Sequence, residues 1–130
     1  MPTLTLKLSR PPAPERLALL ARRLSGLSTT VLGKRNEVTA VVIEAAPAGH
    51  WFVGARVPQE TAALLEIRIT QGTNTTAEKE AFIEAAFEEL SQQLGPLEEA
   101  SYVVVQEVPA TDWGYGGRTQ AARKSGTPVP

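Results

Sequence analysis

The sequence predicts an α+β protein in which two tandem β-α-β repeats form one four-stranded mixed sheet with two helices on one face. In each half of the chain, a stretch of alternating apolar and polar residues is followed by a helical pattern and then by a β-branched run. Six residues also recur at one fixed separation of 62 positions, which indicates an internal duplication. The recurring pairs are Val41 and Val103, Val42 and Val104, Pro47 and Pro109, Ala48 and Ala110, Trp51 and Trp113, and Gly54 and Gly116.

The first repeat, residues 2–56, begins with a strand over residues 3–8, where Leu alternates with Thr and Lys. Three prolines in residues 9–14 end this strand, because proline lacks the N–H that a sheet needs. Apolar residues at spacings of three and four then predict an amphipathic helix from Glu15 to about Gly26. The nearly continuous β-branched run over residues 38–43 predicts a strand that is buried on both faces.

The second repeat, residues 63–118, follows the same order. Residues 65–70 alternate as a strand, and Thr75 with Glu78 has the form of a capping box at the start of a second helix. Gly95-Pro96 ends that helix, and residues 102–105 form the fourth strand. Residues 119–130 show no periodicity, so we predict a tail without regular structure on a single domain that spans residues 1–130.

The expected arrangement of the repeats has a consequence for assembly. A right-handed crossover makes the two strands of each repeat parallel, and the halves then pair about a pseudo-two-fold axis. Neither apolar run, at residues 38–43 or 102–105, contains alternating polar residues. We therefore expect the uncovered face of the sheet to be apolar and the protein to self-associate.

Composition excludes several classes of function. The chain has 130 residues, no cysteine, one histidine and a formal net charge of -1. Disulfides, thiolate nucleophiles and cysteine-based zinc sites are therefore ruled out, and we expect no metal site, no nucleic-acid partner and no membrane partner. With no long apolar segment and no signal-peptide pattern, we expect a cytoplasmic protein.

Motifs in both halves resemble the tautomerase superfamily, typified by 4-oxalocrotonate tautomerase. The chain starts Met-Pro, and residues 47–54, Pro-Ala-Gly-His-Trp-Phe-Val-Gly, are similar to the Pro-Ala-Gly-x-x-Phe-x-Gly stretch of the dehalogenases in that superfamily. The Gln71-Gly72-Thr73 segment resembles the turn that opens the family's helix. The two-copy form looks like the fused members, which include cis-3-chloroacrylic acid dehalogenase and malonate semialdehyde decarboxylase.

The resemblance implies a mechanism centred on Pro2. In this family the N-terminal proline acts as base and acid, which requires removal of Met1 so that Pro2 becomes a terminal secondary amine. The second repeat begins Ala62-Ala63-Leu64, so only the first copy can present an amine. The resemblance therefore implies a cofactor-independent tautomerase that acts on a small 2-oxo or 2-hydroxy carboxylic acid, with one site in each subunit of a homotrimer.

The sequence departs from the family at the substrate-binding arginines. Their positions hold Ala40 and Tyr102 in the second strands of the two repeats, and Thr70 and Thr73 after the third strand. The candidate substrate-binding residues are therefore Arg68, Thr73, Tyr102 and Trp113. Leu8 and Trp51 are further candidates for an apolar wall near Pro2, and Arg10 and Arg118 are further candidates for a positive charge.

Two alternatives stay open from the sequence. The first is a non-catalytic or small-molecule-binding member that kept the fold and lost the arginines. The second is a decarboxylase-like or dehalogenase-like variant, although no histidine or acid matches the residues with which the dehalogenases activate water. The sequence does not identify the natural substrate.

Overall fold

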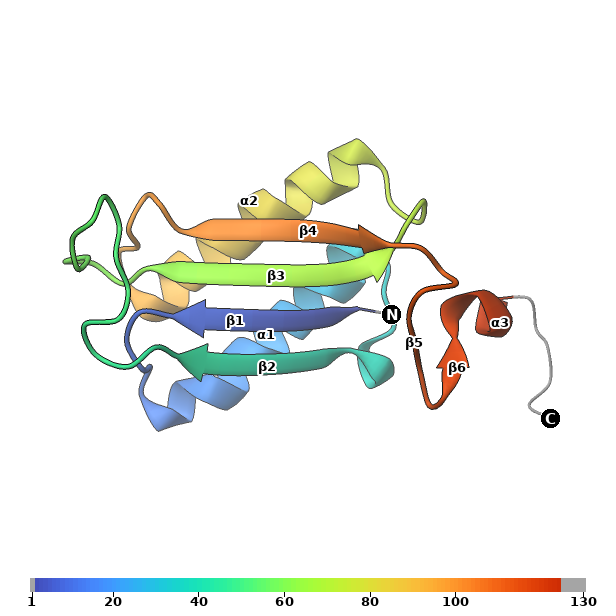
Figure 1. Cartoon of the computed structure of the whole chain (residues 1–130), viewed down its shortest axis with the longest axis horizontal. Coiled ribbons are helices and arrows are strands. Elements are labelled where there is room, and N and C mark those ends of the chain that lie inside the picture. Colours follow the sequence, from blue (N-terminus) through green and yellow to red (C-terminus); the bar gives the residue numbers. More distant parts are fainter. Residues whose placement is uncertain (1, 125–130) are drawn as a thin grey trace.

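The computed structural model of the chain describes residues 2–124 and contains one four-stranded mixed sheet (Figure 1). The strands are β1 (Thr3–Leu8), β2 (Ala40–Ala45), β3 (Ala63–Thr70) and β4 (Tyr102–Val108), in the order β2-β1-β3-β4. β1 is parallel to β2, β3 is parallel to β4, and the central pair β1 and β3 is antiparallel. Helices α1 (Pro14–Leu32) and α2 (Thr76–Leu94) cover one face, which confirms the predicted fold.

The core lies between the sheet and the two helices. The alternating Leu and Ile side chains of β1 and β3 point into it, because successive residues of a strand face opposite sides of the sheet. The helices complete the core with Leu20, Leu24, Phe82, Ala86 and Leu90, each at most 1% exposed. No helix within residues 2–124 is long and apolar enough to cross a membrane.

Helix α1 is longer than the sequence predicted. We expected it to end near Gly26, but it continues to Leu32 and ends at Gly33, whose φ of 71° is the left-handed conformation that glycine favours. A glycine inside a helix costs about 1 kcal/mol relative to alanine. The buried residues Ser28 and Leu32 lie beyond it, so the tertiary packing of the last two turns outweighs this local cost.

Helix α2 begins as predicted. The side chain of Thr75 accepts a hydrogen bond from the Glu78 backbone N–H at 3.1 Å, and the Thr75 backbone N–H donates to Glu78 Oε1 at 2.8 Å. This reciprocal pair is a capping box, and it also holds the preceding loop close to the end of β3.

The uncovered face of the sheet corrects two expectations. Residues 38–43 do not form a strand buried on both faces: Asn36–Val38 is a short 3-10 helix, and Val42 on β2 is 51% exposed. The face is also mixed rather than apolar, because the central strands β1 and β3 add Thr5, Lys7, Glu66 and Arg68 to it. Its apolar residues lie mainly on the edge strands.

The segment after β4 has more structure than expected. β5 (Gly114–Tyr115) pairs with β6 (Arg118–Thr119), and the five-residue helix α3 (Gln120–Lys124) follows. This corrects the prediction of an irregular tail as far as residue 124. The Gln120 N–H donates to the Trp113 carbonyl at 2.9 Å, which fastens the helix to the end of the sheet where the chain begins (Figure 1).

Candidate active site

Pro2 lies at the end of the sheet where β1 and β2 begin and β3 and β4 end. Its side chain is fully buried, and its carbonyl accepts a hydrogen bond from the Ala40 N–H at 3.4 Å. The proline ring fixes φ, so the first residue before β1 is held rigidly. The removal of Met1, on which a basic amine at Pro2 depends, lies outside the described residues.

The loop after β3 reaches the same end of the sheet, because β3 is antiparallel to β1. Within this loop the Thr73 hydroxyl donates to the Thr70 carbonyl at 2.6 Å and accepts from Lys34 Nζ at 2.9 Å. Gly72 N–H donates to Glu107 Oε2 at 2.9 Å, and Glu107 also pairs with Lys79 at 2.7 Å. These two contacts lower the pKa of the Glu107 carboxyl, the Lys79 hydrogen bond having the larger effect.

Lys34 is a buried cation that sequence reasoning missed. It follows the C-cap Gly33 of α1, its backbone N–H donates to the Ser28 carbonyl at 3.1 Å, and the residue is only 8% exposed. Burial lowers the pKa of its ammonium, while the charges of Glu78 and Glu107 act in the opposite direction. The signal in the sequence was only a lysine after a helix-ending glycine, a place where most lysines are solvated.

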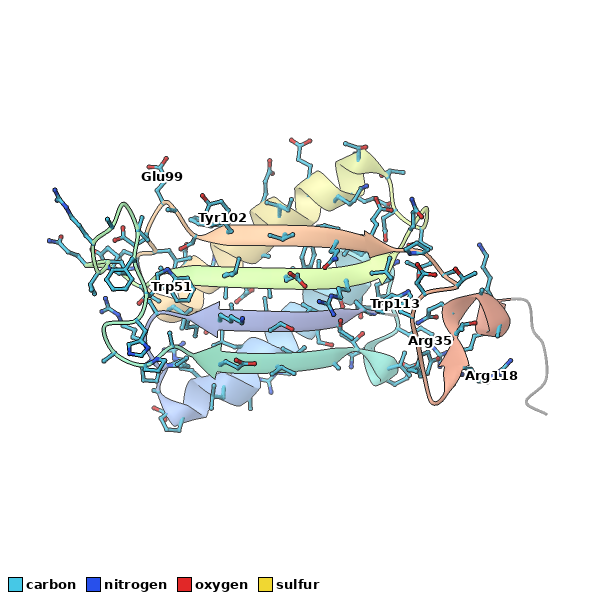
Figure 2. The ribbon with its side chains drawn as sticks, in the orientation of Figure 1. Arg35, Trp51, Glu99, Tyr102, Trp113 and Arg118 are labelled. Atoms are coloured by element: carbon cyan, nitrogen blue, oxygen red, sulfur yellow. The ribbon has the colours of Figure 1, made fainter. Side chains whose placement is uncertain are left out.

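Trp113 covers the side of this end nearest the C-terminal hairpin (Figure 2). Its indole N–H donates to Thr70 Oγ1 at 3.2 Å, so it is tied to the same strand end as Thr73. The hairpin that follows is fixed by Arg123, whose guanidinium lies 3.8 Å from the Tyr115 ring centroid. The sequence-predicted residues Pro2, Thr73 and Trp113 therefore lie at one end of the sheet.

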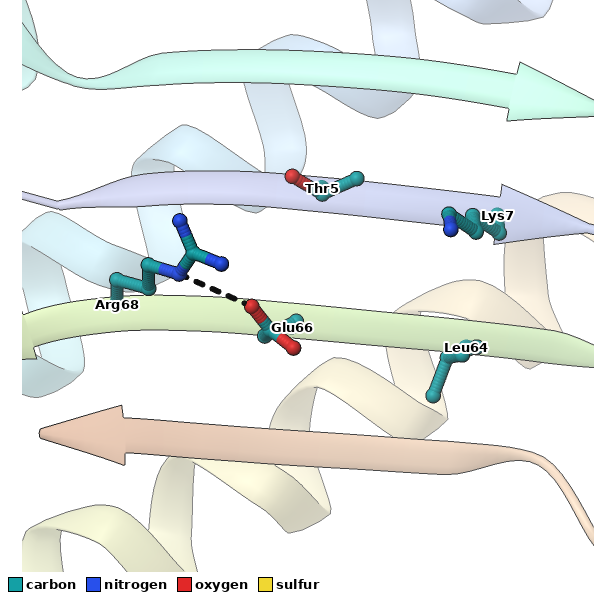
Figure 3. A pocket seen from close by; sticks show the side chains of 5 residues that line it. All are labelled: Thr5, Lys7, Leu64, Glu66 and Arg68. Atoms are coloured by element: carbon teal, nitrogen blue, oxygen red, sulfur yellow. Dashed lines mark hydrogen bonds and ion pairs between the residues drawn. The ribbon is translucent and has the colours of Figure 1, made fainter.

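Arg68 lies on the uncovered face near this end, opposite Thr3 in the β1–β3 register. Its Nε contacts Glu66 Oε1 at 3.1 Å and Gln106 Oε1 at 3.2 Å, and its side chain is 54% exposed. Arg68 and Glu66 line a shallow hollow of about 210 Å³ with residues of β1 and β3 (Figure 3). The guanidinium of Arg68 is therefore already paired with the Glu66 carboxylate.

Several other candidates lie away from Pro2. Tyr102 begins β4 and pairs with Leu64, at the opposite end of the sheet, where Trp51 also lies (Figure 2). Leu8 and Arg10 are at and just beyond the end of β1, so neither meets Pro2 of the same chain, and Leu8 is a core residue. Arg118, in contrast, is on β6, in the hairpin at the Pro2 end of the sheet, where it donates to the Ala122 carbonyl at 3.4 Å (Figure 2).

The functional groups at the Pro2 end come from separate elements of the fold. Within residues 2–124 no group of three or more histidine or acidic side chains is placed to hold a metal ion. What the geometry offers is a buried proline at a strand start, a buried lysine, hydroxyl groups and an indole. Such a set can bind a small anion and, with a free amine at Pro2, move a proton.

Two β-α-β repeats in one chain, with a proline before the first strand, define a class of fused two-repeat proteins. Two family models, both described as tautomerase enzyme, match the chain over residues 40–116 and residues 2–60. Because the first match spans more than half of the sequence and the fold agrees, the chain belongs to the tautomerase superfamily as a fused member.

Solved structures share the fold of this chain over nearly its whole length. The chain is similar to native fused 4-OT, with 29% sequence identity and a TM-score of 0.83 over 92% of this chain and 97% of that chain. It is similar to a fused 4-OT symmetric trimer, with 23% identity and a TM-score of 0.84 over 93% and 98%. A member of the cis-3-chloroacrylic acid dehalogenase family, N1, has 20% identity and a TM-score of 0.82 over 98% and 92%. No curated protein matches the sequence.

Proposed function

We propose that this protein is a cofactor-independent tautomerase that acts on a small 2-oxo or 2-hydroxy carboxylic acid, with Pro2 as its base. The observation that carries the proposal is the position of Pro2, buried at the start of β1 beside the loop after β3, in which the Thr73 hydroxyl accepts a hydrogen bond from Lys34. Membership of the tautomerase superfamily supports the reaction class.

The proposed reaction moves one proton. With Met1 removed, the Pro2 amine takes the proton from the enol hydroxyl of the substrate, and the electron pair of that O–H bond forms the carbonyl. The electron pair of the enol double bond then takes the proton back from Pro2 at carbon. An α-amino group has a reference pKa of about 7.7 to 8.0, a proline amine starts higher, and burial disfavours its charged form. Pro2 can therefore act as both acceptor and donor near neutral pH.

Substrate binding is assigned to Lys34, Thr73 and Trp113. The ammonium of Lys34 polarises the Thr73 hydroxyl, which strengthens the hydrogen bond that this hydroxyl can donate to a substrate carboxylate when it turns away from Thr70. Trp113 supplies an apolar wall. Arg68 is a further candidate at the rim of the site, and Tyr102 can contribute only from a neighbouring subunit, because it lies at the opposite end of its own sheet.

We also propose that the protein is a cytoplasmic homotrimer with one such site in each subunit. The fused 4-OT symmetric trimer supports the oligomeric state. The uncovered sheet face exposes Val42, Tyr102 and Val104 by 51%, 62% and 39%, and contact with neighbouring copies would bury this apolar surface.

A non-catalytic binding protein is the second candidate, and one observation favours it. The positions of the family's arginines hold Ala40, Thr70, Thr73 and Tyr102, and none of these side chains carries a positive charge. A decarboxylase-like or dehalogenase-like variant has the same base and differs in the bond that is broken.

Intact mass followed by labelling tests the proposal. We expect a mass without Met1, and we expect an acetylenic 2-oxo acid to add once, at Pro2, as located by peptide mapping. The Pro2→Ala variant keeps a free amine but loses the secondary amine and the ring, so we expect at least a hundredfold lower rate of ketonisation of an enolised 2-oxo acid, followed by ultraviolet absorbance. Retained Met1, labelling elsewhere or unchanged turnover in Pro2→Ala would contradict the mechanism.

A further inference from the structure

We infer that the end of the sheet opposite Pro2 holds a second, non-catalytic pocket for a small carboxylate, in which Arg10 supplies the charge. A hollow of about 180 Å³ lies there, lined in part by Ser9, Arg10, Gly49, Trp51 and Pro58. Trp51 is the repeat counterpart of Trp113. The hollow is therefore the counterpart, in the other repeat, of the end where Pro2 lies.

No base is available in this second pocket. The second repeat enters β3 through Ala62 and Ala63, which are internal residues with amide nitrogens. The Ala62 N–H donates to Ser9 Oγ at 2.8 Å, and the Ser9 N–H donates to the Ala62 carbonyl at 2.9 Å. In the sheet register Ala63 corresponds to Pro2, and the Ala63 N–H donates to Ser101 Oγ at 3.0 Å. The counterpart of the Pro2 amine is therefore a hydrogen-bonded amide, and a ligand bound there would not undergo proton transfer.

The charge for binding is present. Arg10 Nη2 donates to the Gln59 carbonyl at 2.6 Å, and none of the ion pairs between described residues involves Arg10. A guanidinium has five N–H donors in a planar fork, so most of them remain to bind a carboxylate, with two parallel hydrogen bonds as the strongest geometry. No acceptor for the Ser9 hydroxyl hydrogen is found among the described residues, so this hydroxyl is a further donor.

The size and lining of the hollow predict which class of ligand it can bind. Its volume corresponds to about six water molecules, which suits a short monocarboxylate. Trp51 and Pro58 supply the apolar surface for the carbon chain, and Arg10 and Ser9 supply the polar end. This inference does not depend on the chemistry at Pro2, because none of the residues involved belongs to that end of the sheet.

The two tryptophans report the two ends separately. We would titrate the ¹⁵N-labelled full chain with sodium propanoate at constant ionic strength and follow the indole N–H signals of Trp51 and Trp113 by NMR. We expect a saturable shift of the Trp51 indole and of the Gly49 amide, and no shift with propanamide, which has the same shape without the charge. Arg10→Gln should weaken the affinity reported by Trp51 about tenfold or more, whereas Arg23→Gln, an exposed arginine on α1, should leave it unchanged.

The inference is wrong if the Trp51 shift is linear up to the highest concentration, if propanamide gives the same shift, or if Arg10→Gln binds as the wild type does. A response at Trp113 alone would also overturn it. If Arg10→Gln does not fold, as seen from collapsed amide dispersion, Arg10→Lys replaces it: the charge is kept and the fork is lost, so we expect at least threefold weaker binding. Unchanged affinity in Arg10→Lys would then overturn the inference.

Discussion

Replacing Lys34 by methionine is expected to weaken substrate binding strongly while leaving the fold intact. Lys34 Nζ lies 2.9 Å from Thr73 Oγ1. A carboxylate that accepts a hydrogen bond of about 2.8 Å from the Thr73 hydroxyl must lie within about 6 Å of Nζ. At an effective dielectric constant of about 20, opposite charges at that separation attract by about 3 kcal/mol.

Water near the rim of the site reduces this attraction, so we take about 1.5 to 3 kcal/mol, which corresponds to a roughly ten- to hundredfold increase in KM. The charge of Lys34 acts on the carboxylate, which is unchanged between ground state and transition state. The variant should therefore keep most of its kcat.

The stability of the Lys34→Met variant, unlike its substrate binding, should not decrease. Burial lowers the pKa of Lys34 below its usual 10.5, so at neutral pH the charged ammonium is less stable in the folded protein than in the unfolded chain. This unfavourable contribution disappears as the pH rises from the folded-state pKa towards 10.5. Methionine keeps the apolar stem without the charge, so its melting temperature at neutral pH should be equal to or a few degrees above that of the wild type.

The assay measures kcat and KM for ketonisation of an enolised 2-oxo acid, with thermal melting of the same samples. Arg23→Met is the matched control, because it also removes one positive charge but does so from the exposed face of α1. If Lys34→Met and Arg23→Met have KM values within twofold of each other, Lys34 does not hold the substrate and the reasoning is refuted. A Lys34→Met variant that melts well below the wild type would show that its hydrogen bond outweighs its burial.

Three further changes give separate expectations. Trp113→Phe removes the indole donor to Thr70 and should lower the free energy of unfolding by about 1 kcal/mol in urea titrations, with a raised KM; unchanged values would remove Trp113 from the site. Because the pKa of Glu107 is depressed, its contact with Lys79 stabilises the fold above the usual pKa of 4.5 and is lost as the pH falls through the folded-state value, so Glu107→Gln should flatten the acid limb of a stability–pH curve. Phe82→Ala empties a fully buried core position and should cost about 3 to 5 kcal/mol by urea unfolding; a loss under 1 kcal/mol would mean that the core closes over the gap.

The sequence was most informative where local pattern and tertiary packing agree. The alternation of Leu in β1 and the capping box of Thr75 and Glu78 are local signals, and both elements form where they were predicted. Gly26 was misleading because its unfavourable propensity is local, whereas the burial that continues α1 to Leu32 depends on tertiary packing, in which α1 contacts α2 and β2.

The residues of the site were harder to predict for the same reason. Arg10 and Arg68 are both arginines on or beside central strands, and no local pattern distinguishes their positions relative to Pro2. The antiparallel register sends β1 towards one end of the sheet and β3 towards the other, so Arg10 lies far from Pro2 and Arg68 lies near it. Lys34 was missed because its burial depends on the loop around Thr73, which is distant in sequence.

The same register also explains how the two ends of the sheet can differ in a duplicated chain. Because β1 and β3 are antiparallel, the loop that follows each strand lies beside the start of the other repeat. The Pro2 end therefore combines Pro2, the proposed base, from the first repeat with Thr73 from the second, and the opposite end combines Arg10 from the first repeat with the amides of Ala62 and Ala63 from the second. Within one chain, substitutions in the loop after β3 are therefore expected to act at the Pro2 end, and substitutions in the segment directly after β1 are expected to act at the opposite end.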